Sequence, residues 1–289
     1  MNKNLLFFVS DLHGKESRYE KLFNVISTEK PGLVLIGGDI LPSGILKNIV
    51  KNTEYFDFIQ SYIKPELEEL RNNLKDDYPT MGVILGNDDP RSEEASLLEL
   101  EKEELLHYIH FKSIQYHDFT ICGYSFVPPT PFRLKDWERY DVSRYVDPGC
   151  SAPFEGIRTV EISDYDAEYA TIMKDIALLT ENLDMEKTIM LFHAPPYDSY
   201  LDRTALDGMQ VDRVPLDVHT GSIAIQRFIE EKHPFITLHG HIHESSTITG
   251  HWSQNFGKTR SFSAAFDGAQ LALVKIDLEH PENNRRDLI

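Results

Sequence analysis

Five short apolar runs in this sequence each end at polar residues of the kind that bind metal ions. The runs span residues 4–9, 33–36, 81–85, 188–192 and 235–238. The polar groups that follow them are, in chain order, Asp11-Leu12-His13, Gly38-Asp39, Gly86-Asn87, His193 and Gly240-His241-Ile242-His243. Ligand sites in open α/β sheets form at the carboxyl ends of strands. If the runs are strands, these side chains are therefore expected to converge in one place.

The segments between the runs predict how the strands are connected. Apolar residues at helical spacing predict helices over 17–28 and about 50–74, the second kinked or restarted at Pro65. A third helix is expected from a Ser92 cap to about residue 106. Strands that alternate with helices in this way predict parallel pairing, with the helices on the outer face.

The second half of the chain predicts a mixture of strands, helices and irregular segments. We expect a hairpin from 109–115 and 119–126, helices over 164–179 and 221–231, and last strands near 259–265 and 271–278. The polar tail 282–289 is expected to fray. Residues 127–160 are rich in proline and glycine and predict an irregular insertion. No linker divides the chain, so residues 1–289 are predicted to form a single domain.

Composition restricts the partners and the location. The chain of 289 residues carries 29 Lys and Arg against 47 Asp and Glu, a net charge of −18. Such a surface repels nucleic-acid phosphates, so general nucleic-acid binding is disfavoured. No apolar run is long enough to span a bilayer or form a signal-peptide core. Two cysteines, Cys122 and Cys150, allow at most one disulfide that a domain of this size does not need. We therefore expect a cytoplasmic protein without membrane contact.

Taken singly, the polar groups after the runs have ordinary explanations. Asp-x-His is often a turn or a helix cap, and Gly-Asp and Gly-Asn are common turn residues. The Gly-His-x-His group is more specific, because alternate strand residues share a face. Five such groups in series are not explained by turns. Two aspartates, an asparagine and four histidines suit Mn, Fe, Zn or Ni rather than calcium.

The ordered set of motifs resembles that of the calcineurin-like metallophosphoesterases. This resemblance implies a four-layer αββα sandwich with mixed sheets, of class α/β or α+β, and two divalent transition-metal ions, with manganese favoured. Carried over by position, Asp11, His13 and His243 would hold one ion, and Asn87, His193 and His241 the other. Asp39 would bridge the two. A hydroxide held between the ions would attack phosphorus in line.

One position departs from the family pattern. Many relatives carry a histidine after the motif asparagine, where it can protonate the leaving oxygen, and this chain has Asp88 there. A carboxyl group with an ordinary pKa is a poor proton donor at neutral pH. We therefore assign Asp39, Asn87 and Asp88 to catalysis while leaving the proton donor open, with His251 a lesser candidate. Asp89 is expected to orient a neighbour.

Further residues are weighed for substrate binding. Asn87 and Arg91 are the candidate substrate contacts, although Arg91 could equally be a helix-start residue in solvent. The turn Pro128-Pro129-Thr130-Pro131, with Phe132, Trp137 and Tyr140, is interpreted as a substrate-facing flap, a dimer contact or core cover.

These observations predict a metal-dependent phosphoesterase acting on a small phosphoester, with phosphodiesters favoured. The alternatives are an inactive scaffold or protein-binding module on the same fold, and a phosphomonoesterase or nuclease within the class. The sequence leaves the oligomeric state open.

Overall fold

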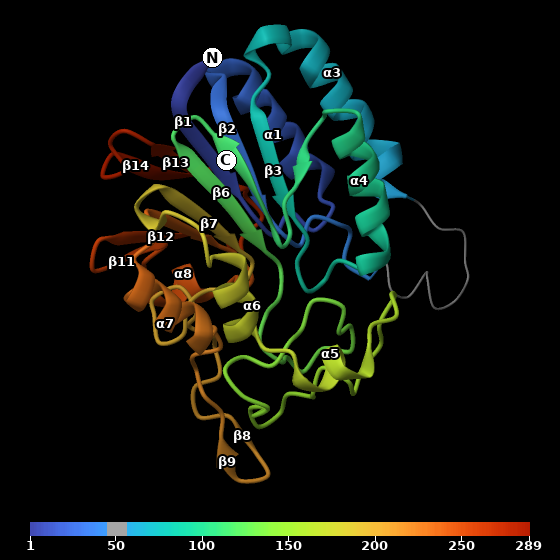
Figure 1. Ribbon diagram of the computed structural model, residues 1–289, viewed down its shortest axis with the longest axis vertical. Coiled ribbons are helices and arrows are strands. Elements are labelled where there is room, and N and C mark those ends of the chain that lie inside the picture. Colours follow the sequence, from blue (N-terminus) through green and yellow to red (C-terminus); the bar gives the residue numbers. More distant parts are fainter. Residues whose placement is uncertain (45–56) are drawn as a thin grey trace.

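Two six-stranded mixed sheets form the centre of the molecule (Figure 1). The computed structural model describes residues 1–44 and 57–289. In the first sheet the order is β14-β13-β1-β2-β3-β4. Its strands are β1 (Asn2–Val9), β2 (Pro31–Gly37), β3 (Thr80–Ile84), β4 (His107–Tyr108), β13 (Ala272–Asp277) and β14 (Asn284–Leu288). Strands β1, β2, β3 and β4 run parallel, as the alternation with helices predicts.

The second sheet has the order β11-β12-β10-β7-β6-β5. Its strands are β5 (Lys112–Tyr116), β6 (Phe119–Tyr124), β7 (Thr188–Phe192), β10 (Ile236–His239), β11 (Ser253–Phe256) and β12 (Thr259–Ser263). The strands β6, β7, β10 and β12 are parallel, and β5 closes one edge as the expected hairpin with β6. A separate small ribbon pairs β8 (Gln210–Val211) with β9 (Val214–Pro215).

Helices cover the outer face of each sheet (Figure 1). The first sheet is covered by α1 (Glu16–Glu29), α3 (Lys64–Leu74) and α4 (Glu94–Lys102). On the second lie α6 (Ile172–Leu179), α7 (Ile223–Lys232) and the short α8 (Ser245–Thr249), while α5 (Asp164–Tyr169) lies apart from the sheets. The expected four-layer αββα sandwich is confirmed.

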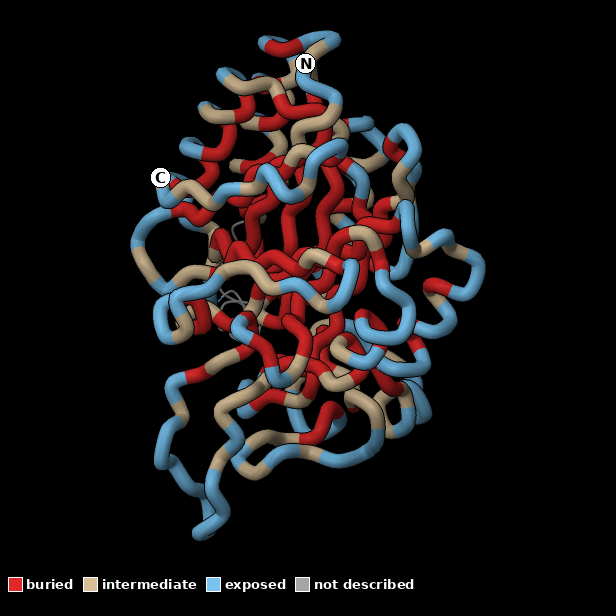
Figure 2. Tube along the Cα trace, turned by 90° about the vertical axis from the view of Figure 1, so that its left-hand side faces the viewer, coloured by how far each residue is buried: buried red, intermediate tan, exposed pale blue. Residues whose placement is uncertain are grey.

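The continuous apolar run of β1 is explained by burial on both of its faces. Leu6 and Phe8 point into the core between the two sheets. Phe7 and Val9 alternate with them and belong to the core under the helices. A strand that is buried on both faces has no polar alternation, so its sequence reads as a solid hydrophobic block. Figure 2 shows that the buried parts of the chain gather in the middle of the molecule, with exposed chain around them.

Pro65 has the predicted effect on its helix. The five residues before α3, Ile59–Ile63, form a π-helical turn, and Pro65 lies in the first turn of α3. Proline lacks the N–H that a regular α-helical turn requires, and a π-turn accommodates such an irregularity without ending the helix. The part of the predicted helix from 50 to 56 lies outside the described residues.

Three local predictions are wrong. The tail does not fray, because β14 pairs with β13 in antiparallel register. Ser92 does not cap a helix: it lies inside a 3-10 turn, Arg91–Glu93, and α4 ends at Lys102 rather than near 106. The helix predicted over 164–179 is two helices, because the Thr171 hydroxyl accepts a hydrogen bond from the Lys174 N–H and starts α6 anew.

Residues 127–160 are irregular, as predicted. This stretch lies wholly within the described residues and contains isolated bridges but no helix or longer strand. Together with the β8–β9 ribbon it lies beyond the carboxyl ends of the central strands (Figure 1). It is therefore placed next to the residues that follow those strands.

Candidate metal centre

The five polar groups after the strands meet at one edge of the sandwich. They come from both sheets: β1, β2 and β3 supply three of them, and β7 and β10 supply the other two. Four side chains lie closest together: one ligand atom from each of Asp11, His13, Asp39 and His243 falls within 4.8 Å of the others. The His13 and His243 Nε2 atoms are 3.2 Å apart, and His243 Nε2 is 3.2 Å from an Asp11 carboxylate oxygen.

A second group lies on the other side of Asp39. His193 Nε2 is 3.0 Å from the side-chain oxygen of Asn87 and 3.4 Å from Asp39 Oδ2. The His241 ring lies beside that of His193, with centroids 5.2 Å apart. Asp39 therefore contacts His13 on one side, at 3.9 Å, and His193 on the other. All seven sequence-predicted ligands are brought together, with Asp39 between the two groups.

The loops that carry the ligands are joined through their backbones. The Asp11 N–H donates to the Gly38 carbonyl, and the His13 N–H donates to the Asp39 carbonyl. Asp11, His13, Asp39 and His241 have φ between 49° and 74°, the left-handed region that non-glycine residues rarely adopt. Such backbone strain is concentrated at functional sites, where the surrounding structure maintains it.

Gly86 is required by the close approach of these loops. A Cβ atom at Gly86 would lie 2.3 Å from Asp39 Oδ1 and 2.6 Å from the His193 ring. Both distances are too short for any larger residue. The glycine of the Gly-Asn motif therefore leaves the space in which Asp39 and His193 lie side by side.

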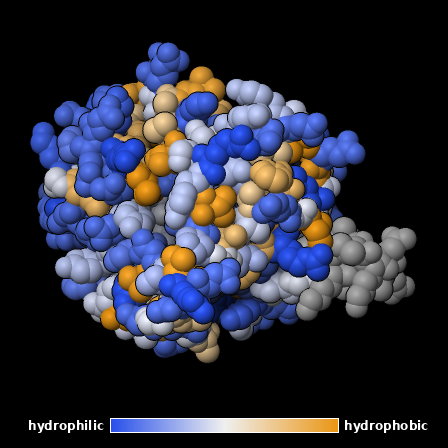
Figure 3. All heavy atoms as spheres, turned by 90° about the horizontal axis from the view of Figure 1, so that it is seen from below, coloured by the Kyte–Doolittle hydropathy of each residue, from blue (hydrophilic) through white to orange (hydrophobic). Residues whose placement is uncertain are grey.

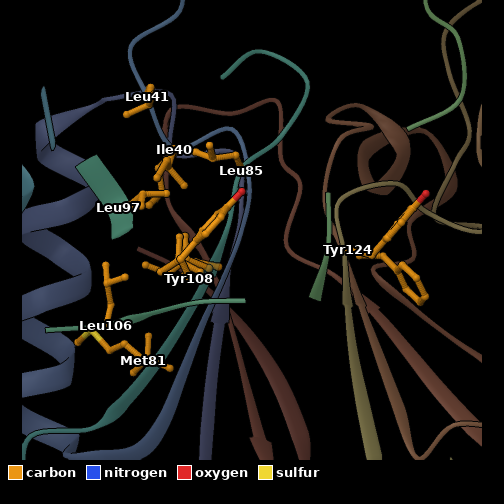
Figure 4. Packing of buried hydrophobic residues seen from close by; sticks show 14 of the residues in the cluster. Ile40, Leu41, Met81, Leu85, Leu97, Leu106, Tyr108 and Tyr124 are labelled. Atoms are coloured by element: carbon orange, nitrogen blue, oxygen red, sulfur yellow. The ribbon is translucent and has the colours of Figure 1, made fainter. Parts of the chain in front are cut away.

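Asp89 positions the loop that carries Asp39. Its buried carboxylate accepts hydrogen bonds from the N–H groups of Ile40, Leu41 and Gly86, at 3.1, 2.8 and 2.9 Å. The side chains of Ile40 and Leu41 are themselves buried in the core under the helices, and Figure 4 shows Ile40 among Leu85 and other buried residues. Asp89 thus orients a neighbour rather than entering the site, as its position in the motif predicts.

Two residues that support Asp11 are absent from the sequence-based assignment. The Ser10 hydroxyl donates to the Asp11 carboxylate. The buried Arg18 guanidinium donates to the Asp11 backbone carbonyl at 2.6 Å. Arg18 lies four residues before Leu22 and eight before Ile26, both buried. An arginine on the apolar face of a helix is the signal that would have identified it.

The candidate ligand atoms of the two histidines, His193 and His13, face oxygen atoms, an arrangement that a positive charge stabilises. His193 Nδ1 lies 2.7 Å from the Gly37 carbonyl, so it must donate there, and Nε2 is the ring nitrogen that faces Asn87 Oδ1 at 3.0 Å. Burial would lower the pKa of His193, but the Asp39 carboxylate raises it to about 9. Burial likewise opposes protonation of His13, and Asp88 and Asp39 raise its pKa to about 9.

The carboxylates of Asp11 and Asp39 are buried beside histidines. Among the described residues, the side chains that form ion pairs with Asp11 and Asp39 are histidines, with no lysine or arginine. A buried carboxylate requires a compensating charge, and a divalent cation ligated by carboxylate, amide and imidazole provides it. The donor set therefore fits divalent metal ions.

Asp88 faces His13 and also the open side of the site. Its carboxylate is 3.3 Å from His13 Nδ1, where the Ser43 hydroxyl also lies at 3.0 Å. Its backbone N–H donates to Asp39 Oδ1 at 2.8 Å. A carboxylate at Nδ1 holds that proton and directs Nε2 toward the cluster. This contact with a candidate ligand is a role that the motif alone does not indicate.

A pocket of about 630 Å³ opens over the candidate metal residues. It is lined by His13, Asp39, Asn87, Asp88, His241 and His243, and also by residues 128–134. Arg91 is absent from this lining. Its guanidinium lies over the Trp137 ring at 5.1 Å, its Nε contacts Glu94, and it lines a different cavity. The assignment of Arg91 to substrate binding is therefore corrected.

Arg133 is the arginine that does line the pocket. In the described part of the chain its side chain has no hydrogen bond or ion pair. Sequence reasoning missed it, although it directly follows the turn and Phe132 that were interpreted as a flap. Of the flap residues, Phe132 lines the pocket, whereas Trp137 and Tyr140 are buried and serve as core.

The structure also bears on three further expectations. His251 is exposed, stacks on Tyr200 and does not line the pocket, so it is not placed to donate a proton there. Cys122 and Cys150 are both free. Across the described residues, every helix is too short or too polar to cross a bilayer.

The comparisons with known proteins agree with this arrangement. Residues 5–245 match the family described as calcineurin-like phosphoesterase. A solved crystal structure superposes with a TM-score of 0.59 at 15% identity, covering 99% of this chain and 98% of that chain. The protein TT1561 of Thermus thermophilus superposes with a TM-score of 0.53 at 14% identity, over 99% and 98% of the two chains. At these identities the likeness shows the fold. No curated protein matches the sequence.

Proposed function

Since the chain belongs to the calcineurin-like phosphoesterase family, we propose that it is a metal-dependent hydrolase of phosphodiesters. The observation that carries the proposal is that the other six predicted ligands lie around Asp39, beside one pocket that five of the seven line. In this assignment Asp11, His13 and His243 hold one divalent ion, Asn87, His193 and His241 hold a second, and Asp39 contacts both. Manganese is the ion that we favour.

The bound ions would supply an activated water and positive charge for the phosphoryl oxygens. The chain's own residues arrange the site for them. His193 donates a hydrogen bond from Nδ1 to the Gly37 carbonyl, which leaves Nε2 free as a ligand. The Asp88 carboxylate lies 3.3 Å from His13 Nδ1 and in the same way leaves His13 Nε2 free as a ligand. Arg133, on the rim of the pocket, is the cation placed to contact a phosphate oxygen.

The charges around the pocket favour a diester over a monoester. Asp88 and Glu244 line it in addition to the candidate ligand Asp39, and Arg133 is the one lysine or arginine among the described residues that does so. A phosphodiester carries a single negative charge, whereas a monoester approaches two at neutral pH. Repulsion by the carboxylates therefore acts more strongly on the monoester.

The test compares bis(4-nitrophenyl) phosphate with 4-nitrophenyl phosphate, using metal-free protein reconstituted with manganese. We expect about two ions per chain and a higher kcat/KM for the diester. Preference for the monoester would assign the chain to the phosphomonoesterases. Stoichiometric metal without hydrolysis of either compound, or no metal after reconstitution, would refute the enzyme and favour a scaffold on this fold.

A further inference from the structure

One wall of the pocket, formed by the loop 128–134 with Thr204 and Leu206, is largely apolar. Its apolar members are Pro128, Pro129, Pro131, Phe132, Leu134 and Leu206. This wall lies inside a pocket and not on a broad apolar face. Figure 3 shows the molecule from below, and there the hydrophobic residues of the surface form separate patches between hydrophilic ones. The occupant is therefore a small molecule and not a protein surface.

A buried ion pair holds the loop 128–134 in place without a ligand. Lys135 and Glu138 are both fully buried, with Nζ 2.6 Å from Glu138 Oε2. Lys135 Nζ also donates to the Thr130 carbonyl at 2.8 Å. The Thr130 N–H and hydroxyl both donate to Glu138, at 2.9 and 2.5 Å. These bonds hold Thr130, within the loop, to two buried residues that follow the loop, so the prolines form a preorganised wall.

The two hydroxyl groups of this wall already have partners, and Arg133 is its one charged side chain. The Thr130 hydroxyl is used by Glu138, and the Thr204 hydroxyl donates to the Val218 carbonyl at 2.9 Å. Apart from Arg133, the wall therefore offers apolar area rather than hydrogen bonds. Buried apolar area is favourable for a ring without charge and unfavourable for a second charged group.

We infer that the pocket selects phosphodiesters in which one ester group carries an uncharged aromatic ring that packs on the proline-rich wall. This rests on the proposed function, because the phosphate must lie at the metal residues. The volume is sufficient: a cavity of roughly 150 Å³ holds a benzene ring, and this pocket measures about 630 Å³. Phe132, 58% exposed at the rim, is placed to cover such a ring.

The experiment uses two substrates with the same leaving group, methyl 4-nitrophenyl phosphate and benzyl 4-nitrophenyl phosphate. Both retain an alkyl ester, so their intrinsic reactivities are close and the ring is the difference. With the manganese-loaded protein we expect kcat/KM for the benzyl ester to be roughly tenfold higher or more, from the apolar area that the ring buries. Calorimetric titration with the benzyl and methyl esters of methylphosphonic acid should give the same order of affinities.

The matched variants are F132A and F154A. Phe154 lies in the same irregular segment, is 49% exposed and does not line the pocket. F132A should lower the benzyl-to-methyl ratio severalfold, whereas F154A should keep the wild-type ratio. Equal kcat/KM for the two esters, or an unchanged ratio in F132A, would overturn this inference and leave the proposed function standing. If neither ester is cleaved, the proposed function fails and the inference fails with it.

Discussion

Replacing Lys135 by methionine is expected to destabilise the protein strongly, because it leaves the Glu138 carboxylate in the interior without its cation. Both side chains are 0% exposed and lie 2.6 Å apart. Burial already raises the pKa of Glu138 despite the ammonium group beside it. Methionine preserves most of the side-chain volume, so the change removes the charge and its hydrogen bonds with little loss of packing.

The magnitude follows from what remains around Glu138. Removing one partner of a buried ion pair costs roughly 3–5 kcal/mol. Thr130 still donates two hydrogen bonds to the carboxylate, so we expect the lower end, about 3 kcal/mol. For a chain of this size that corresponds to a fall in Tm of roughly 6–10 °C.

The measurement is denaturant and thermal unfolding of the metal-free protein followed by circular dichroism. The matched control is Lys64→Met, since Lys64 lies at the same 2.6 Å from Glu103 but with side chains 26% and 40% exposed. Exposed ion pairs contribute little, so this variant should unfold like the wild type. The double variant Lys135→Met/Glu138→Leu should recover much of the lost stability, because it removes the unpaired buried charge.

The pH dependence gives a second check on the Lys135 variant. An ionised Glu138 lowers the stability of the folded variant, whereas in the unfolded chain water solvates its charge. The destabilisation should therefore shrink as the pH falls and the folded carboxyl takes up a proton. If Lys135→Met unfolds no earlier than Lys64→Met, the argument that burial decides the value of this pair is wrong.

Three further predictions concern the site and its surroundings. Asp39→Asn should lower metal-dependent hydrolysis at least roughly a hundredfold and reduce bound metal, with unchanged circular dichroism; near-normal turnover at saturating manganese would remove Asp39 from the site. Aryl diesters should be cleaved far faster than dialkyl diesters, since general acid catalysis contributes about 10²–10⁴-fold and no histidine follows Asn87. Asp88→His should flatten that dependence on leaving-group pKa, and similar wild-type rates for both ester types would show that another residue donates the proton. Burial, and then Arg91, lowers the pKa of His110 well below its usual value, so stability should fall as the pH drops below about 6.5. His110→Gln should show a smaller fall in urea midpoint between pH 7.5 and 5.5, and equal falls would contradict the assignment.

Local pattern was sufficient for the elements that meet at the candidate metal centre. Each strand is a short apolar block, and each block is followed by residues that accept left-handed backbone or bind cations. In parallel strands the carboxyl ends lie at one edge, so the convergence of Asp11, Asp39 and Asn87 follows from order along the chain alone. The family motif adds the histidines of the second sheet to the same edge.

Other features depended on contacts that no local pattern records. Arg91 and Arg133 are both arginines after a proline-containing turn, and only packing against Trp137 turns one of them away from the pocket. The polar tail became β14 because the edge of β13 offered unpaired backbone groups.

The sequence by itself thus determined the central parallel strands, their alternation with helices in the first half, and the residues available to bind metal, because periodicity and motif spacing are local properties. The tertiary structure alone decided the wall of the pocket and the residues that line it. Lys135 and Glu138 read as ordinary surface charges in the sequence, and they become an interior ion pair only when the irregular loop folds over them. Long-range packing sets burial, and burial sets the energetic role of a charge.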